Sequence, residues 1–114
     1  MGNHITIRQA EGTWVVRAGG AVLGESTAAL ELIEGRYDGV IYFPRDDIAM
    51  AFLEKSDHTT QCPHKGEASY YSIVTKSKTI PNAAWSYETP NEDVGEIAGH
   101  LSFYPSDELT VEEI

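Results

Sequence analysis

Residues 14–26 read WVVRAGGAVLGES, and this stretch decides the fold class. Two runs of strand-forming residues flank Gly19 and Gly20, and a two-residue hairpin turn favours glycine because its central positions need positive φ. Residues 29–44, ALELIEGRYDGVIYFP, repeat the pattern with a loop carried by residues 35–39. Two local hairpins predict a mainly antiparallel β fold.

The rest of the chain is expected to add strands and one short helix. In residues 89–99, TPNEDVGEIAG, Thr89 can cap a helix whose capping box is completed by Glu92. Gly99 can supply the left-handed exit. Residues 45–56, RDDIAMAFLEKS, suit a strand and a helical turn equally. Further strands are expected at 68–75, 83–88, 100–105 and 109–113.

Composition limits the partners that the chain could take. The chain has 114 residues, of which 41% are hydrophobic, and its formal net charge is −10. We expect one domain over residues 1–114, because this length supports a single core. The acidic balance disfavours nucleic acid and anionic membrane surfaces as partners. A single cysteine cannot form an internal disulfide, and no secretory or transmembrane pattern is present, so a cytoplasmic protein is expected.

The stretch TTQCPHKGEASYYS, residues 59–72, holds that cysteine, Cys62. One hypothesis makes Cys62 a nucleophile, with His100 as general base and Lys65 stabilising developing negative charge. The alternative is that Cys62 is a small buried hydrophobic residue beside a turn. Both remain open from the residues alone.

Cofactor and metal motifs are weak in this sequence. Four groups could supply nitrogen or sulfur ligands to zinc, but their spacing matches no standard metal motif: Cys62, His58, His64 and His100. Lys65 precedes a glycine without the spacing of a phosphate-binding loop. Asp46 and Asp47 point to opposite faces of an extended chain, which favours capping over joint metal binding. No metal site and no cofactor are predicted.

The aromatic residues are the most informative feature. On an alternating strand Trp85 and Tyr87 share a face. Tyr70 and Tyr71 point to opposite faces, so we expect one of them to lie outside the core. Aromatic side chains that converge from several strands form a pocket for flat or cationic groups. The competing interpretation is that these rings simply fill the core.

The motifs YFPRDD, CPHKGEASYYS, AAWSY and IAGHLSFYP resemble, in this order, the domain-of-unknown-function family 427. These are small bacterial and fungal proteins, sometimes labelled nucleotidyltransferase-like. The resemblance covers about residues 17–112. It departs from the family pattern at His64, where an aromatic residue is common. The matching motif residues are Tyr42, Phe43, Pro44, Cys62, Pro63, Lys65, Gly66, Tyr70, Trp85, Tyr87, Gly99, His100, Phe103 and Tyr104.

This resemblance implies a β-tent fold, in which two antiparallel sheets meet at an angle over a cleft. Relatives with that fold include the cereblon ligand-binding domain, the Yippee proteins and the methionine-R-sulfoxide reductases. Most of them hold a zinc with two CxxC pairs, whereas this chain has one cysteine. The resemblance therefore implies the fold without its structural zinc. No glycine-rich phosphate loop supports the nucleotidyltransferase label, and fold alone does not carry an activity over.

Three functions follow as hypotheses. The first is a small-ligand-binding domain whose pocket is formed by Tyr42, Lys65, Tyr70, Trp85, Tyr87, His100 and Tyr104. The second is an enzyme of transferase or hydrolase type that uses Cys62, His100 and Lys65. The third is an acidic interaction module that pairs with a basic protein, or with a second copy as a homodimer.

Overall fold

The computed structural model describes residues 4–114, which form ten strands in three antiparallel sheets. The first sheet contains β1 (Ile5–Gln9), β4 (Leu30–Glu34) and β5 (Val40–Tyr42). The second contains β10 (Leu109–Glu113), β2 (Trp14–Ala18) and β3 (Ala21–Ser26). The third contains β6 (Leu53–Cys62), β7 (Gly66–Val74), β8 (Thr79–Ser86) and β9 (Ser102–Phe103).

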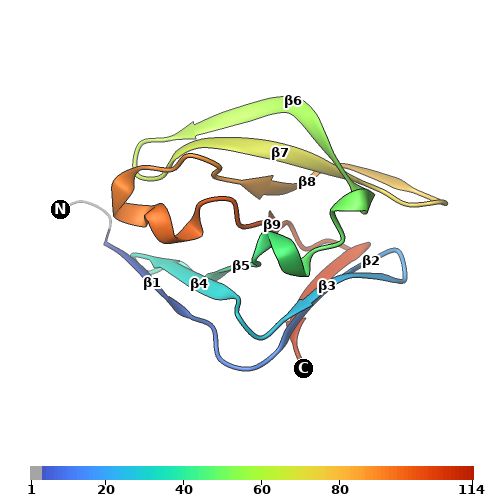
Figure 1. The fold of residues 1–114 in the computed structure, drawn as a ribbon, viewed down its shortest axis with the longest axis horizontal. Coiled ribbons are helices and arrows are strands. Elements are labelled where there is room, and N and C mark those ends of the chain that lie inside the picture. Colours follow the sequence, from blue (N-terminus) through green and yellow to red (C-terminus); the bar gives the residue numbers. More distant parts are fainter. Residues whose placement is uncertain (1–3) are drawn as a thin grey trace.

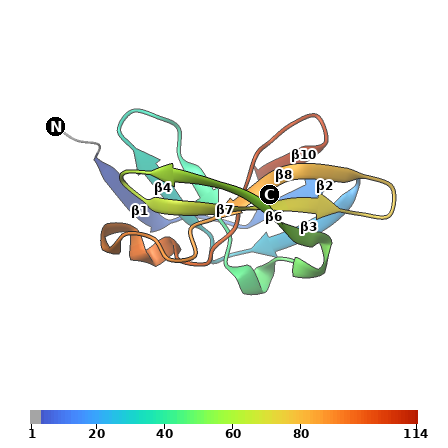
Figure 2. The ribbon, with the colours of Figure 1, turned by 90° about the horizontal axis from the view of Figure 1, so that it is seen from above.

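The four-stranded sheet lies across the top of Figure 1, above the two three-stranded sheets, which sit side by side. The view from above in Figure 2 shows the same order, with β1 and β4 at one end and β2 and β3 at the other. Two sheets were expected, and three are found. The reason is that each predicted hairpin recruits its own third strand, β1 for β4–β5 and β10 for β2–β3.

Both predicted hairpins are confirmed. Gly19 and Gly20 form the turn between β2 and β3, with φ values of 56° and 85°. β4 pairs with β5 in antiparallel register, with Leu30 opposite Tyr42. The strands expected at 68–75 and 83–88 are β7 and β8, each of which begins earlier than predicted.

The expected helix at 89–99 takes a different form. Its helical part is the 3₁₀ segment η3 (Glu92–Ile97), which is kinked at Val94 and preceded by Asn91 with no side-chain cap. The predicted capping box at Thr89 is therefore wrong. Gly99 does adopt positive φ, at 74°, as the sequence indicated for the exit from this segment.

Two strands were not predicted. Residues 45–56 resolve into the 3₁₀ turns η1 (Arg45–Asp47) and η2 (Met50–Phe52), after which β6 runs for ten residues. η1 follows Pro44 without a side-chain cap, and the Asp47 carboxylate instead accepts a hydrogen bond from Ser26 Oγ at 2.6 Å. β1 lies in the N-terminal region, for which we predicted no strand.

Buried side chains form two clusters. The larger, which we call the central cluster, includes Val16, Phe43, Tyr71, Ile73 and Leu101. The smaller, the tyrosine cluster, includes Leu32, Tyr42, Tyr70, Tyr87, Val94 and Ile97. The two clusters place opposite faces of single strands in different parts of the core, as with Tyr42 and Phe43 on neighbouring positions.

Tyr70 and Tyr71 are both buried, with exposed fractions of 8% and 6%, so the expectation that one would lie outside the core is wrong. β7 is covered on both faces. Tyr70 belongs to the tyrosine cluster, whereas Tyr71 lies beneath the Arg45 guanidinium, 5.7 Å from its ring centroid.

Arg45 links three segments of the fold. Its Nε donates to the Gly99 carbonyl at 3.1 Å, and its Nη2 lies 3.1 Å from a Glu88 carboxylate oxygen. Glu88 also accepts hydrogen bonds from the Tyr71 hydroxyl and from Lys55 Nζ. Burial alone would raise the pKa of Glu88, but these donors and the positive charges outweigh it and lower the pKa.

Two fully buried serines provide a matched test of hydrogen bonding in this core. Ser102 Oγ donates to the Ile41 carbonyl at 2.8 Å, whereas Ser86 Oγ has no partner among the described residues. An unpaired buried hydroxyl costs about 1–3 kcal/mol. We therefore expect Ser86→Ala to raise the free energy of unfolding by about 1 kcal/mol and Ser102→Ala to lower it by about 1 kcal/mol, as measured by urea denaturation. Equal destabilisation by both variants would contradict the assignment.

Candidate functional site

A hollow of about 220 Å³ lies between the strands β4 and β5 on one side and β7 and β8 on the other. We call it the aromatic hollow. Six of the seven residues predicted to bind a ligand line it: Tyr42, Lys65, Tyr70, Trp85, Tyr87 and Tyr104.

Strand alternation explains why these side chains converge. Trp85 in β8 and Tyr87 directly after it share a face, and Tyr70 in β7 lies opposite Trp85 across the ladder. Val40 and Tyr42 likewise share the face of β5 that looks into the hollow. The predicted pairing of faces on β5 and β8 is thus confirmed.

The rings form walls at defined angles. Trp85 lies edge-on to Tyr42, with ring centroids 6.3 Å apart, and its Nε1 donates to the Tyr42 hydroxyl at 3.4 Å. The ring centroids of Trp85 and Tyr104 are 4.3 Å apart. The hydroxyl of Tyr70 is 3.3 Å from that of Tyr104 and 3.1 Å from Thr60 Oγ1. These hydrogen bonds fix the ring orientations and leave the aromatic faces as the main surface of the walls.

Lys65 enters the hollow from the turn between β6 and β7. Its backbone N–H donates to the Cys62 carbonyl at 3.2 Å, and Gly66 follows with φ of 108°. Lys65 Nζ donates to Glu34 Oε1 at 2.8 Å and lies 5.9 Å from the centroid of the Tyr87 ring. Burial alone would lower the pKa of Lys65, but the Glu34 hydrogen bond and the nearby acidic groups outweigh it and raise the pKa.

A family comparison fits this arrangement. The model of the domain of unknown function DUF427, named NTP_transf_9, matches residues 6–113. The chain belongs to the DUF427 family. No similar protein was found among curated sequences.

The phenols of this DUF427 chain stay protonated well above neutral pH. Burial raises the pKa of Tyr42 to about 12 against a smaller opposing effect of the Trp85 hydrogen bond, and burial also raises the pKa of Tyr87 to about 12. Burial likewise raises the pKa of Tyr104, as does its hydrogen bond with Tyr70. The walls of the hollow are therefore uncharged at pH 7.

Tyr42 allows a test of this burial through the pH dependence of stability. A pKa raised from 10.0 to about 12 means that the folded state holds a proton which the unfolded state has released. This contribution to the free energy of unfolding is complete below pH 10 and is lost as pH rises toward 12. We expect Tyr42→Phe to reduce the fall in stability over this range, as measured by urea denaturation at several pH values. An unchanged pH dependence would contradict the burial of this phenol.

His100, the seventh residue predicted for the pocket, does not line the aromatic hollow. It follows the left-handed Gly99, and its Nδ1 lies 3.2 Å from the Ala98 carbonyl oxygen. The turn at Gly99 directs the chain toward β9 after this residue. The structure thus brings Lys65 to the aromatic residues but does not place His100 with them.

Cys62 ends β6 and is half-buried against the tyrosine cluster. Within residues 4–114, neither the His100 imidazole nor the Lys65 ammonium hydrogen-bonds to its sulfur. The nucleophile hypothesis therefore stays a prediction without a base in contact with the thiol.

Alkylation tests the Cys62 hypothesis directly. A thiol without an activating partner reacts at an ordinary rate, and partial burial slows it further. We expect iodoacetamide to modify native Cys62 no faster than free cysteine at pH 7. A rate well above that of the urea-unfolded chain, lowered again by His100→Ala, would instead support the nucleophile.

Three residues of the hollow were missed in the sequence: Glu34, Tyr37 and Asp38. Glu34 could have been found, because alternation from Leu32 places it on the same face of β4 as a core residue. Tyr37 and Asp38 lie in the exposed β4–β5 loop, where no periodicity applies. Tyr37 is 79% exposed, so it stands at the rim of the hollow.

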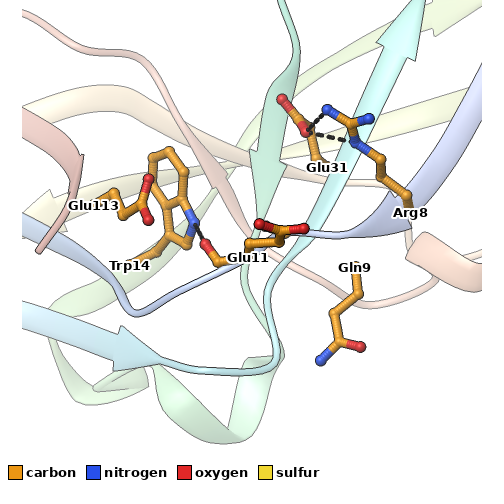
Figure 3. A pocket seen from close by; sticks show the side chains of 7 residues that line it. Arg8, Gln9, Glu11, Trp14, Glu31 and Glu113 are labelled. Carbon is orange, nitrogen blue, oxygen red and sulfur yellow. Dashed lines mark hydrogen bonds and ion pairs between the residues drawn. The ribbon is translucent and has the colours of Figure 1, made fainter.

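Two further hollows adjoin the aromatic hollow. One of about 280 Å³ shares Val40, Trp85 and Tyr104 with it, so the Trp85–Tyr104 pair is a wall common to both. The other, of about 340 Å³, is shown in Figure 3. We call it the Trp14 hollow. It has one aromatic ring and three carboxylates, of which Glu31 is paired with Arg8 at 2.9 Å.

Searches for metal-ligand groups and membrane spans gave negative results for residues 4–114. The described chain has no group of three or more His, Cys, Asp or Glu side chains that could hold a metal ion. None of its helical segments has the length and apolar character needed to cross a membrane.

Proposed function

We propose that the aromatic hollow is a binding site for a small organic ligand. The observation that carries this proposal is the convergence of five rings, from four segments of the chain, around one half-buried lysine–glutamate pair. Ligand sites are typically apolar hollows with a few convergent polar groups. The fold could have filled this space with aliphatic side chains, but it contains tyrosines with solvent-accessible neighbours such as Tyr104, which is 47% exposed.

The size of the hollow indicates a fragment-sized ligand. Sites for drug-sized molecules have volumes of roughly 300–1,000 Å³, whereas the aromatic hollow measures about 220 Å³. Its walls suit a group that stacks on Trp85 and Tyr104. Glu34 and Lys65 supply an acceptor and a donor at one end, where their hydrogen bond fixes both side chains.

We also infer that the sheets form a β-tent with this hollow in its cleft. Support comes from the joint between β5 and β9, where Phe43 and Leu101 exchange backbone hydrogen bonds of 2.8 and 2.9 Å. This joint holds the β1–β4–β5 sheet against the four-stranded sheet along one line, and the hollow lies between them. A crystal structure that superposes on the cereblon ligand-binding domain over both sheets would support the assignment, and one with another strand order would overturn it.

Nuclear magnetic resonance with a fragment panel tests the binding proposal. The panel contains indole and benzamide as neutral compounds, benzoate as an anion and choline as a cation. We expect at least one fragment to shift the Lys65 amide and Tyr87 ring signals, because these residues line the aromatic hollow and not the hollow that shares Trp85. If no fragment at millimolar concentration shifts either signal, the proposal falls.

A further inference from the structure

We propose that the aromatic hollow selects organic cations, of the class of alkylated or quaternary ammonium groups. This inference rests on the proposed function and adds the charge of the ligand to it. Three features of the hollow support the choice: the charge of its lining, the position of Lys65 and the surfaces that its walls present.

The lining carries an excess of negative charge. Glu34 and Asp38 against Lys65 leave a net formal charge of −1. The whole chain carries −10, so its field also draws cations toward the surface and repels anions. An anionic ligand would therefore approach against both the local charge and the overall charge.

Lys65 already satisfies its charge within the protein. Its ammonium is 2.8 Å from a Glu34 oxygen, and the Lys65 and Glu34 side chains are only 13% and 19% exposed. An anion that took Lys65 as its partner would have to displace Glu34 and leave that carboxylate half-buried beside a second negative charge. Lys65 is thus a poor anchor for a carboxylate or phosphate.

The same lysine shows how the hollow holds a cation. Lys65 Nζ lies between one carboxylate, Glu34, and one aromatic face, that of Tyr87, at 5.9 Å from its centroid. A distance within about 6 Å is typical of a cation–π interaction. A ligand ammonium would meet the same combination across the hollow, where Trp85 and Tyr104 supply the faces and Asp38 lies at the exposed rim.

A quaternary ammonium also suits the walls because it donates no hydrogen bond. The ring hydroxyls of Tyr42 and Tyr70 are engaged with neighbouring side chains, so the rings offer mainly their faces. Aromatic faces attract such a cation through the ring quadrupole, and tryptophan is the most effective of them. A neutral ligand of the same shape would gain only the apolar contact.

Choline and 3,3-dimethylbutan-1-ol form the decisive pair, because they have the same shape and differ in charge. Both are titrated into the protein by NMR, with the Tyr87 ring signal as the readout. We expect choline to bind about tenfold more tightly, which is the effect of roughly 1.4 kcal/mol of cation–π and carboxylate attraction. Equal affinities would overturn the inference.

Charge variants separate this inference from the proposed function. Asp38→Asn should weaken choline about two- to threefold and leave the neutral alcohol unchanged. Asp46→Asn removes the same charge from an exposed site that does not line the hollow, so it should change neither affinity by as much. Lys65→Gln should preserve or strengthen choline binding because it frees the Glu34 charge for the ligand.

Each outcome has one meaning. If both compounds bind equally and Asp38→Asn affects neither, the hollow binds ligands without charge selection, and only the inference fails. If Lys65→Gln abolishes binding of benzoate and choline never bound, an anion site is shown and the inference is overturned. If no compound reaches the Tyr87 signal, the proposed function fails with it.

Discussion

Phe43→Ala is expected to lower the free energy of unfolding by about 3–5 kcal/mol, the usual cost of truncating a fully buried phenylalanine. Phe43 is 0% exposed, and its ring packs edge-on to Phe103 with centroids 5.9 Å apart. Its backbone forms the bridge to Leu101 that joins β5 to β9. Removal of the ring leaves a cavity at the line where two sheets meet, and partial relaxation cannot fill it.

Urea denaturation at 25 °C measures this loss, with Phe52→Ala as the matched control. Phe52 is 37% exposed in the turn η2, so the same truncation there should cost about 1 kcal/mol or less. A thermal melt should show the same order, with Tm lower by at least about 10 °C for Phe43→Ala. A loss below 1.5 times that of the control would show that Phe43 is not the centre of the joint.

Trp85→Ala is expected to weaken choline binding at least about thirtyfold, which corresponds to roughly 2 kcal/mol of lost cation–π attraction in a desolvated site. Trp85 contacts both Tyr42 and Tyr104 and forms the wall between two hollows. Its removal opens one hollow to the other and deletes the largest aromatic face. Because the side chain is only half-buried, the stability loss should be smaller than that of Phe43→Ala.

Two conservative variants control for this change. Trp85→Phe keeps an aromatic face and should weaken choline binding only a few-fold, since phenylalanine is the weaker π partner. Trp14→Phe changes the other tryptophan, which lines the Trp14 hollow and not the aromatic hollow, and should leave the affinity unchanged. Loss of binding in Trp14→Phe with full binding in Trp85→Ala would place the cation in the wrong hollow.

The features predicted correctly from the sequence are local ones. The Gly19-Gly20 turn and the alternation of Trp85 with Tyr87 depend on neighbouring residues, and the structure confirms both. The tyrosine at position 42 reaches the same hollow because β5 also alternates. Six of the predicted ligand residues therefore converge although they come from distant parts of the chain.

Strand β6 shows why other elements were missed. It pairs with β7 alone, at the edge of its sheet, and most of its side chains are exposed on both faces. Such a strand has no need for alternating apolar residues, so LEKSDHTTQC carries no period to detect. In η3, Gly95 and the kink at Val94 favour short 3₁₀ turns over the continuous helix that the capping pattern indicated.

The partner of Lys65 could not be predicted because the contact is non-local. Glu34 and Lys65 are 31 residues apart, and only the packing of β4 beside the β6–β7 turn brings them together. Without that contact Lys65 resembled a free positive charge for an anion. With it, the same lysine becomes the model for how a cation is held. The network of Arg45, Tyr71 and Glu88 was hidden for the same reason.

Intermolecular nuclear Overhauser effects between choline methyl protons and the protein test the central claim most directly. The account predicts contacts to the ring protons of Trp85, Tyr87 and Tyr104 and none to Trp14, although the Trp14 hollow is also acidic. Because the chain has two tryptophans, the single-tryptophan variant Trp14→Phe removes any ambiguity in the indole signals. Contacts confined to Trp14 in the unmodified chain, or to no aromatic ring, would contradict the account.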